Sequence, residues 1–393
     1  MKFQGVDYYH IDELLSEEEK MTRNLVREFL EKEVEPLITE AFHQEKPLNL
    51  EELAPKMGEL GMIGTCLPEE YGGNGANYIT FGLICQEVER IDSTLRSFIA
   101  VQFGLVEYAI LRFGSEEQKQ KWLPLIARGE KIGCFGLTEP NHGSDVAAME
   151  TVAKKDADGW VINGTKQWIT ESSIANVAVV WAKTDEGVRG FLVERGTEGF
   201  SQTFQARKGS MRASDVGELG FSDCRIPFEN MLPNVKGLSA PFSCLNQARY
   251  GIAWGAIGTA MDCYETALNY AKEREQFGAP IASYQLVQEK LVTMLIEITK
   301  GQLLVYRLGR LMDEGKANSA QISLAKKNNV AVARMCARTA REILGANGIS
   351  LDYSPIRHMA NIESVYTYEG TDDIHTLILG QDITGIPAFR RTL

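Results

Sequence analysis

The order of residue patterns along this 393-residue chain is the feature that most constrains its fold. Before about residue 128, apolar side chains recur at intervals of three and four, for example at Val26 and Leu30, which is the period of an amphipathic helix. Between about residues 133 and 237, short β-branched and aromatic runs alternate with Asn-Gly, Asp-Gly and Glu-Gly pairs, which are typical of hairpin turns. Helical periodicity returns from Pro241 onward. This segregation of helices and strands predicts an α+β fold rather than alternating β/α units.

Two pairs of strands are expected in the middle segment. The first would run from Trp160 to Trp168 around a turn at Asn163-Gly164, and the second would pair residues 177–182 with residues 188–194. The segregated pattern disfavours a Rossmann core. The chain also contains neither G-x-G-x-x-G nor G-x-x-x-x-G-K-S/T, so the usual phosphate loops would not bind a dinucleotide here.

Composition and charge argue against several functional classes. A formal net charge of −12 disfavours nucleic acid and anionic membranes as partners, because both need a basic surface. The seven cysteines lie at least 19 positions apart, which predicts reduced thiols and a cytoplasmic location, or the mitochondrial matrix for a processed eukaryotic chain. The N-terminus turns acidic at once and we expect no apolar stretch of eighteen residues, hence neither secretion nor membrane insertion. Since H-E-x-x-H and G-x-S-x-G are absent, we expect neither a catalytic metal nor a serine nucleophile.

The segment Tyr368-Glu-Gly-Thr371 places a single carboxylate between an aromatic residue and a glycine. The glycine lets the backbone approach a ligand closely. A carboxylate in an apolar pocket has a raised pKa and can remove a proton that a neighbouring carbonyl group activates. Glu369 is therefore a candidate base, and a solvated loop glutamate is the competing interpretation.

Arg96 follows Glu89 by seven positions, so the two side chains would share one face of a helix if that helix is continuous. A surface ion pair is the simpler explanation of this spacing. A guanidinium that Glu89 orients inside a pocket would instead bind a substrate carboxylate through two hydrogen bonds.

A turn-rich loop from Cys134 to Asp145 opens the middle segment, and Trp168-Ile-Thr170 ends one of its expected strands. Backbone donors and hydroxyl groups in such a loop can bind a polar ring or a phosphate, and a tryptophan followed by a hydroxyl suits a planar cofactor. The alternatives are a structural turn ordered by Ser144 and Asp145, and a tryptophan in the core of a β-sandwich.

Six ordered motifs resemble those of the acyl-CoA dehydrogenase family over essentially the whole chain. They are Pro68-Glu-Glu-Tyr-Gly-Gly, Leu137-Thr-Glu-Pro with Gly143-Ser-Asp, Asn163-Gly-Thr-Lys, Trp168-Ile-Thr, Arg274-Glu-Gln-Phe-Gly-Ala-Pro-Ile281 and Tyr368-Glu-Gly-Thr. The resemblance implies an N-terminal all-α domain over residues 1–132, a middle β domain (barrel or sandwich) over 133–240 and a C-terminal four-helix bundle over 241–393. It also implies bound FAD, a CoA-thioester substrate and a homotetramer.

By this resemblance Glu369 would remove the substrate α-proton while hydride leaves the β-carbon for flavin N5, with Thr170 near N5. The backbone N–H of Glu369 and a flavin hydroxyl would stabilise the enolate oxygen. The residues implied to bind FAD within one subunit are Phe135, Leu137, Thr138, Gly143, Ser144, Trp168, Ile169, Thr170, Thr371 and Phe389. Arg274, Phe277 and Gln285 would reach the FAD of a neighbouring subunit.

Within the family, the chain resembles the glutaryl-CoA dehydrogenase branch through Phe242-Ser-Cys-Leu-Asn-Gln-Ala-Arg-Tyr-Gly-Ile-Ala-Trp254 and Ile356-Arg-His358 in addition to the motifs above. This implies oxidation of glutaryl-CoA, loss of CO2 to give crotonyl-CoA, and transfer of electrons to an electron-transfer flavoprotein. Arg96 would bind the distal carboxylate. The residues implied on the substrate side are Glu89, Arg96, Ser97, Ser144, Phe242, Asn246, Arg249, Tyr368 and Gly370.

Three positions refine this interpretation. Non-decarboxylating relatives carry valine where Tyr368 stands, which favours decarboxylation. Ala100 stands where a serine contact to the carboxylate is expected. Ala248 occupies the position at which another branch of the family carries its base, which leaves Glu369 in that role. The alternatives are oxidation without decarboxylation, another acyl-CoA substrate, a redox-neutral CoA-thioester lyase, and a non-catalytic CoA-binding subunit.

Overall fold

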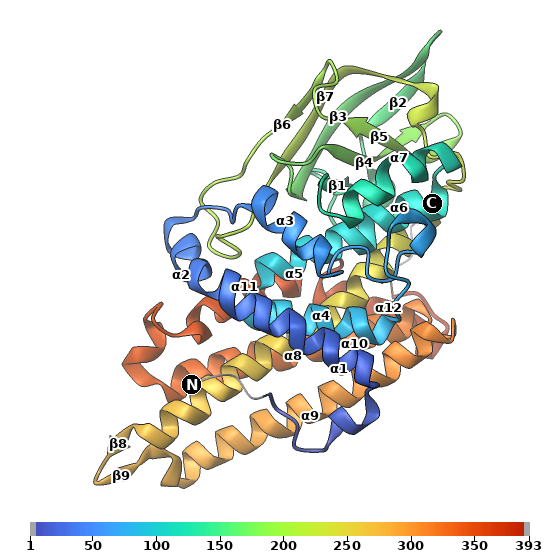
Figure 1. The fold of residues 1–393 in the computed structure, drawn as a ribbon. Coiled ribbons are helices and arrows are strands. Elements are labelled where there is room, and N and C mark those ends of the chain that lie inside the picture. The colour runs from blue at the N-terminus through green and yellow to red at the C-terminus, as the bar shows by residue number, and fades with distance from the viewer. Residues whose placement is uncertain (1–4, 389–393) are drawn as a thin grey trace.

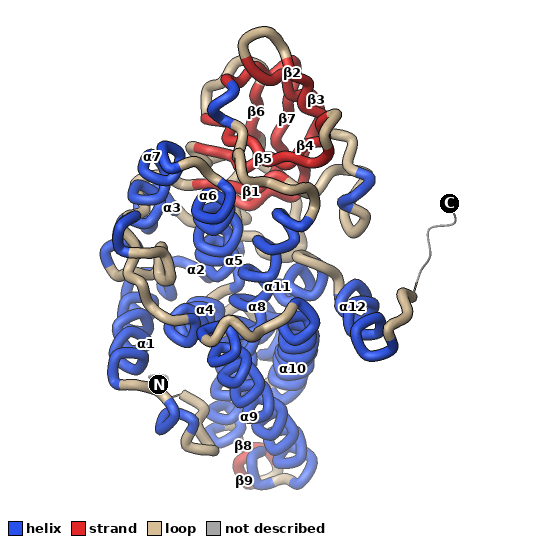
Figure 2. Tube along the Cα trace, turned by 90° about the vertical axis from the view of Figure 1, so that its right-hand side faces the viewer, coloured by secondary structure: helices blue, strands red, loops and turns tan. Residues whose placement is uncertain are grey.

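A computed structural model, which describes residues 5–388, places a strand-rich region between two helical ones (Figure 1). The sheet lies at one end of the molecule, the N-terminal helices lie below it, and three long C-terminal helices extend to the opposite end (Figures 1 and 2). The α+β expectation is confirmed. The N-terminal helices are α1 (Glu17–Phe29), α2 (Glu35–Gln44), α3 (Leu50–Glu59), α4 (Tyr78–Ile91), α5 (Ser93–Ala100), α6 (Tyr108–Phe113) and α7 (Glu116–Ala127).

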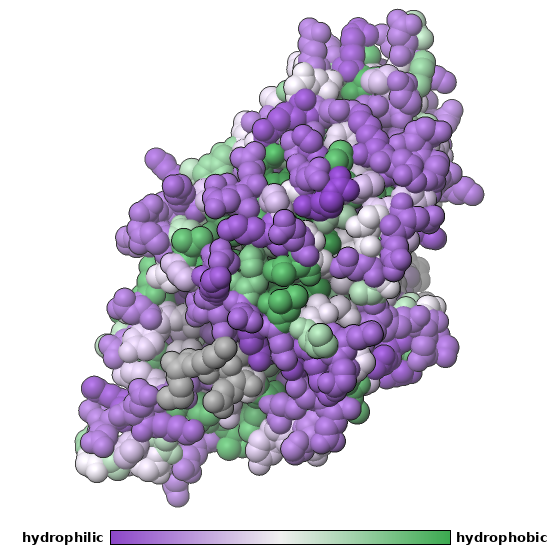
Figure 3. Space-filling model, viewed as in Figure 1, coloured by the Kyte–Doolittle hydropathy of each residue, from purple (hydrophilic) through white to green (hydrophobic). Residues whose placement is uncertain are grey.

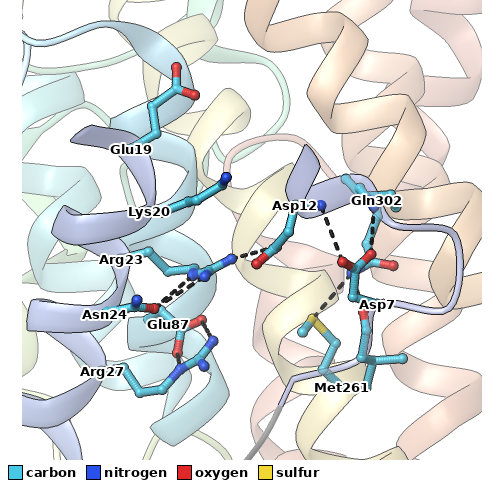
Figure 4. Close-up of polar contacts among 12 residues, drawn as sticks. Asp7, Asp12, Glu19, Lys20, Arg23, Asn24, Arg27, Glu87, Met261 and Gln302 are labelled. Atoms are coloured by element: carbon cyan, nitrogen blue, oxygen red, sulfur yellow. Dashed lines mark hydrogen bonds and ion pairs between the residues drawn. The ribbon is translucent and has the colours of Figure 1, made fainter. Parts of the chain in front are cut away.

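Helix α1 begins with a capping box in which Ser16 and Glu19 exchange hydrogen bonds, and its apolar face buries Val26. Buried charges join it to α4 (Figure 4). Arg27 donates through Nε to Glu87 Oε2 at 2.9 Å and through Nη2 to Glu87 Oε1 at 2.7 Å. Burial alone would raise the pKa of Glu87, but hydrogen bonds and charges from Arg27 and Arg90 hold it below its ordinary value. The pair therefore fixes the N-terminal helix against the helix that carries Glu89.

Seven strands form one curled sheet in the order β1-β4-β2-β3-β7-β6, with β5 also paired to β4. The pairing of residues 177–182 with 188–194 is confirmed, because β4 and β5 are antiparallel with Val177 opposite Glu194. The strands are β1 (Gly133–Gly136), β2 (Val152–Lys155), β3 (Gly159–Thr170), β4 (Val177–Thr184), β5 (Gly187–Glu194), β6 (Phe200–Gln202) and β7 (Val216–Pro227).

The predicted turn at Asn163-Gly164 is wrong. Strand β3 runs through this dipeptide and pairs with β7 along its length, with a register shift between Ile162 and Gly164. The Asn163 side chain accepts a hydrogen bond from Asp223 N at 2.8 Å and donates one to Asp223 Oδ1 at 3.1 Å. The asparagine side chain thus satisfies a backbone group that the shift leaves unpaired, and the pair marks a β-bulge instead of a hairpin.

The C-terminal region is built on three long helices, and two shorter ones follow. Helices α8 and α9 are joined by a small β8–β9 hairpin at the end farthest from the sheet (Figures 1 and 2). The elements are α8 (Ser239–Glu273), β8 (Glu275–Gln276), β9 (Ala279–Pro280), α9 (Gln285–Asp313), α10 (Ser319–Ile343), α11 (Ser354–Thr367) and α12 (Asp372–Thr384).

Glycines allow α8 to lie directly against α4. A Cβ atom on Gly258 would lie 1.9 Å from the carbonyl oxygen of Gln86, and one on Gly255 would lie 2.0 Å from Oε2 of Glu89. Larger residues at these positions would separate the helices. The close approach brings Glu89 into the interior between α4 and α8.

The expectation of no long apolar stretch needs correction. Among residues 5–388, the helical run Ser93–Phe113 is long and apolar enough to cross a membrane by length and composition, with a mean hydropathy of 1.3. It is 89% buried inside the protein, which is the behaviour of a core helix. The face of the protein shown in Figure 3 is mostly hydrophilic, with smaller apolar patches over the helical region.

Replacing Arg27 with methionine tests the ion pair between α1 and α4. We expect the free energy of unfolding to fall by about 2–3 kcal/mol, because Glu87 stays buried with one fewer cationic partner. Denaturant titration followed by circular dichroism measures the change. Lys20→Met on the same helix is the control, since Lys20 pairs with the exposed Glu17 and its loss should cost about 0.5 kcal/mol or less. Equal losses in the two variants would contradict a stabilising role for the buried pair.

Candidate active site

The loop Tyr368-Glu-Gly-Thr371 joins α11 to α12 and is held at both ends. Tyr368 N donates to Ser364 O at 2.9 Å, which ends α11, and the Thr371 hydroxyl accepts from Ile374 N at 3.2 Å, which caps α12. Between these bonds Glu369 adopts a left-handed conformation with φ of 52°, and Gly370 has φ of 94°. A left-handed glutamate is uncommon and persists only where the surroundings impose it. The loop therefore presents Glu369 in one imposed conformation.

The carboxylate of Glu369 lies among buried cations. Its Oε2 atom is buried without a hydrogen-bond partner in the described part of the chain. Burial raises the pKa of Glu369, and the charges of Arg96, Lys326 and Arg249 oppose this rise. The interpretation as a solvated loop glutamate does not fit this environment. A buried carboxylate with a free oxygen is suited to accepting a proton.

Arg96 and Glu89 are both fully buried, so the surface ion-pair interpretation is wrong. Arg96 Nε donates to Glu89 Oε2 at 2.7 Å. Its Nη2 donates to the Tyr368 hydroxyl, and the centroid of the Tyr368 ring lies 5.4 Å from the guanidinium carbon. Its Nη1 is buried with no partner among the described residues. Such an unpartnered charged donor is costly unless a ligand or water satisfies it.

Glu89 and Arg96 form an ion pair although they do not lie on one continuous helix. Their spacing of seven positions predicts a shared helical face only for a continuous helix. Helix α4 ends at Ile91, and Asp92 is extended with φ of −165° and ψ of 142°. Asp92 then caps α5 by accepting from Thr94 N at 2.8 Å, and it accepts from Arg357 of α11 at 2.5 Å. A buried carboxylate thus breaks the helix and turns the second segment so that Arg96 meets Glu89.

The remaining residues expected on the substrate side divide into two groups. Arg249 Nε donates to the carbonyl oxygen of Glu369 at 2.8 Å, and its Nη1 lies 3.3 Å from the side-chain oxygen of Asn246. Arg249 therefore contacts the loop that carries Glu369, and Asn246 contacts Arg249. Ser97 is buried on α5, whereas Phe242 on α8 and Ser144 are exposed.

Residues expected to bind a planar cofactor lie along the edge of the sheet that faces the helices. Thr138 O accepts from Gln167 N at 2.9 Å, which joins the loop after β1 to the end of β3. Trp168 is 57% exposed and has φ of 61°, so the interpretation as a core tryptophan is wrong. Phe135, Leu137 and Ile169 are buried, Thr138 and Thr170 are half-buried, and Gly143 and Ser144 are exposed.

A buried ion pair supports the loop after β1. Lys166 Nζ donates to Glu139 Oε1 at 2.8 Å and to Leu137 O at 3.1 Å. Burial alone would raise the pKa of Glu139, but hydrogen bonds from Glu150, Lys166 and Thr151 lower it to about 2. Glu139 is therefore ionised, and its hydrogen bonds order the loop. The ordering does not depend on Ser144 and Asp145 alone.

A single chain does not bring all predicted cofactor residues together. Arg274, Phe277 and Gln285 lie at the β8–β9 hairpin and the start of α9, at the end opposite the sheet (Figure 1). Phe277 is 96% exposed with φ of 53°. Phe389 lies outside the described residues.

Sequence reasoning missed two buried groups at the base loop, Lys326 and His375. Lys326 lies on the same face of α10 as the buried residues Ile322 and Val330, so its position on an apolar stripe was the available signal. His375 lies on α12, and neither of its ring nitrogens has a hydrogen-bond partner in the part of the chain that the structure describes. Burial, together with the charges of Lys326 and Arg249, lowers its pKa to about 2. The imidazole is therefore neutral.

Three family models match consecutive parts of the chain. The model described as acyl-CoA dehydrogenase, N-terminal domain, matches residues 16–130, and the middle-domain model matches residues 134–224. The C-terminal-domain model matches residues 235–384.

Solved structures and curated proteins agree with these matches. A glutaryl-CoA dehydrogenase from Mycobacterium smegmatis is 49% identical, with a TM-score of 0.96 over 98% of this chain and 100% of that one. A structure of a glutaryl-CoA dehydrogenase from the same organism in complex with FADH2 is 47% identical, with a TM-score of 0.96 over 98% and 99% of the two chains. The mitochondrial short-chain specific acyl-CoA dehydrogenase of Mus musculus is 36% identical over 377 residues, which are 93% of this chain and 90% of that protein.

Gly255→Ala tests the packing that positions Glu89 and Arg96. We expect a loss of about 1–3 kcal/mol in the free energy of unfolding, because the added methyl group would overlap Glu89 Oε2. Gly380→Ala is the matched control, since Gly380 is also helical but a Cβ there meets nothing within 4 Å. That control should be neutral or stabilising. A neutral Gly255→Ala variant would show that the space beside Glu89 is not restricted.

Proposed function

Because the chain belongs to the acyl-CoA dehydrogenase family, whose members are FAD-dependent oxidoreductases, we propose that it oxidises glutaryl-CoA and decarboxylates the product to crotonyl-CoA and CO2. One observation carries this proposal: Nη1 of the buried Arg96 and the buried Oε2 atom of Glu369 lie in the same site, and neither has a hydrogen-bond partner within residues 5–388. Arg96 would bind the distal carboxylate of the substrate, and Glu369 would accept its α-proton. The glutaryl-CoA dehydrogenases among the similar structures support this choice of substrate.

The residues present fit a flavin. Trp168 offers an exposed aromatic face, and the hydroxyl of Thr170 and the loop from Leu137 to Ser144 offer polar groups beside it. Bound FAD supplies a hydride acceptor. Phe277, Arg274 and Gln285 would reach the FAD of another subunit in a homotetramer, and their exposure on one subunit supports this arrangement. Electrons would then pass to an electron-transfer flavoprotein.

Glu369 is arranged to act as a base. The cations around it oppose the effect of burial on its pKa, and its free oxygen can approach the substrate α-carbon without first breaking a hydrogen bond. Removal of this proton places negative charge on the thioester oxygen. The backbone N–H of Glu369 would donate to that oxygen.

Tyr368 offers a physical reason for decarboxylation. Its hydroxyl accepts from Arg96 Nη2 and so engages one N–H of that amino group, whereas Nη1 has no partner among the described residues and can bind the substrate carboxylate. A bidentate contact would stabilise the carboxylate strongly and oppose loss of CO2. With a weaker contact, the bond between the γ-carbon and the carboxylate breaks, and its electron pair moves into the conjugated thioester to form a dienolate. The protonated Glu369 then returns its proton to the γ-carbon.

A second candidate is oxidation of a short acyl-CoA without decarboxylation. The 36% identity to the short-chain enzyme favours it, and so does Ala100, which is fully buried and offers no hydroxyl to a carboxylate. A redox-neutral lyase is disfavoured because it would not need the base at Glu369. Incubation with glutaryl-CoA and an artificial electron acceptor distinguishes the candidates. Mass spectrometry should find crotonyl-CoA; glutaconyl-CoA alone would show that decarboxylation does not occur, and no product would reject glutaryl-CoA as substrate.

Glu369→Gln should bind glutaryl-CoA but fail to reduce FAD, because the amide cannot accept the α-proton. Anaerobic mixing followed by flavin absorbance measures the reaction, and we expect its rate to fall by a factor of about 10² to 10⁴ or more. Retained flavin absorbance before mixing is the folding control. Ordinary flavin bleaching in the variant would remove Glu369 from the role of base.

Replacing Arg96 with methionine, together with Glu89→Gln to avoid stranding a buried anion, should discriminate between substrates. We expect kcat/KM for glutaryl-CoA to fall by the equivalent of about 2–5 kcal/mol, because the substrate carboxylate loses its cationic partner. Butyryl-CoA has no distal carboxylate and serves as the control within the same variant. Similar losses for the two substrates would contradict the assignment of Arg96.

A further inference from the structure

Two buried cations bind three consecutive carbonyl groups of the base loop. Lys326 Nζ donates to the carbonyl oxygen of Tyr368 and to that of Gly370, the latter at 2.8 Å. Arg249 Nε donates to the carbonyl between them, that of Glu369, at 2.8 Å. The backbone on each side of Glu369 is thus tied to the same ammonium group. Helix α10, which carries Lys326, is thereby coupled to the loop before α12.

Burying the charged side chain of Lys326 costs free energy unless hydrogen bonds and nearby opposite charges compensate for the lost water. Its side chain is inside the protein, and within residues 5–388 its ammonium group donates to backbone carbonyl oxygens rather than to a carboxylate. Burial lowers its pKa to about 7, and the charge of Glu369 opposes this change. The adjacent Lys327 pairs with Asp372, so that carboxylate is already engaged. The charge of Glu369 favours the charged lysine most, and that of Asp372 adds to it.

We propose that Lys326 is a positioning residue for Glu369: its ammonium group clamps the carbonyls on both sides of the base and supplies positive charge that favours the ionised carboxylate. The inference rests on the proposed function, in which Glu369 is the base. The clamp accounts for the left-handed backbone at Glu369, which an unrestrained loop would not retain. Lys326 touches the loop backbone and acts on the substrate only through Glu369.

Charged and titratable groups of four neighbouring helices, α4, α5, α8 and α12, surround this pair. Arg96 of α5 is already bonded to Glu89 of α4, and Arg249 of α8 is bonded to the loop. Burial raises the pKa of the Cys85 thiol of α4, which therefore stays protonated. His375 of α12 is neutral because its pKa is lowered to about 2. Glu369 and Lys326 are therefore the groups whose ionisation depends on each other near neutral pH.

The test uses the FAD-loaded protein with Lys326→Met, Lys326→Gln and Lys326→Arg. Methionine removes both charge and donors, glutamine keeps amide donors without charge, and arginine keeps both. Lys327→Met is the matched control, because it removes a positive charge from the adjacent residue of α10, whose partner is Asp372. Each variant is measured by its pH–rate profile with glutaryl-CoA or butyryl-CoA, and by amide hydrogen exchange of the peptide that contains residues 366–374.

We expect Lys326→Met to shift the acidic midpoint of the kcat/KM profile to higher pH, because loss of a nearby cation raises the pKa of Glu369. Its kcat should fall about 10- to 100-fold with a much smaller change in KM, as expected for a displaced base. Exchange of the loop amides should accelerate. Lys326→Gln should share the shifted midpoint, Lys326→Arg should restore the original midpoint, and Lys327→Met should change neither.

An unchanged midpoint and unchanged loop exchange in Lys326→Met would overturn the proposal. Should that variant fail to fold, the comparison of Lys326→Gln with Lys326→Arg decides the matter, since they differ in charge while both can donate. Equal midpoints in those two variants would reject the electrostatic role. If the unmodified enzyme oxidises neither acyl-CoA, the proposed function fails, and hydrogen exchange of Lys326→Met against Lys327→Met still determines whether Lys326 holds the loop.

Discussion

The site depends on a balance among charged side chains. Folding buries these side chains between α4, α5, α8, α10 and the loop before α12. An isolated carboxylate in this interior would take up a proton, and an isolated lysine would lose one. Glu369, Lys326, Arg249 and Arg96 each lower the cost of burying an opposite charge nearby. Among the described residues, two atoms of this arrangement have no hydrogen-bond partner, Oε2 of Glu369 and Nη1 of Arg96.

This balance requires close packing of helices that are far apart in sequence. Glycines in α8 allow α4 to approach until Glu89 lies against Gly255, and Asp92 redirects the chain so that Arg96 reaches Glu89. Glu369 lies in a third region, the loop between α11 and α12. Folding thus places charges from residues 89 to 369 in one volume, and the exposed hairpin carrying Phe277 leaves further predicted cofactor residues outside it.

Much of the fold was predictable because it follows from local patterns in the amino-acid sequence. Helical periodicity and the β4–β5 hairpin follow from residue order, as the agreement at Val177 and Glu194 illustrates. The prediction failed at Asn163-Gly164 because the same dipeptide suits a turn or a bulge, and pairing with β7 decides between them. It also failed on the apolar run from Ser93 to Phe113, whose burial depends on helices that surround it.

The sequence by itself identified the class of fold, the family resemblance and Glu369 as a candidate base, since these depend on motifs and periodicity. It could not decide whether Glu369, Arg96 and Trp168 are solvated, paired or packed, because burial depends on distant segments. The tertiary structure decided that Arg96 is fully buried beside Tyr368, that Trp168 is exposed, and that Lys326 binds the base loop. A lysine on a helix 43 residues before Glu369 acquires a connection to it only when α10 packs beside the loop.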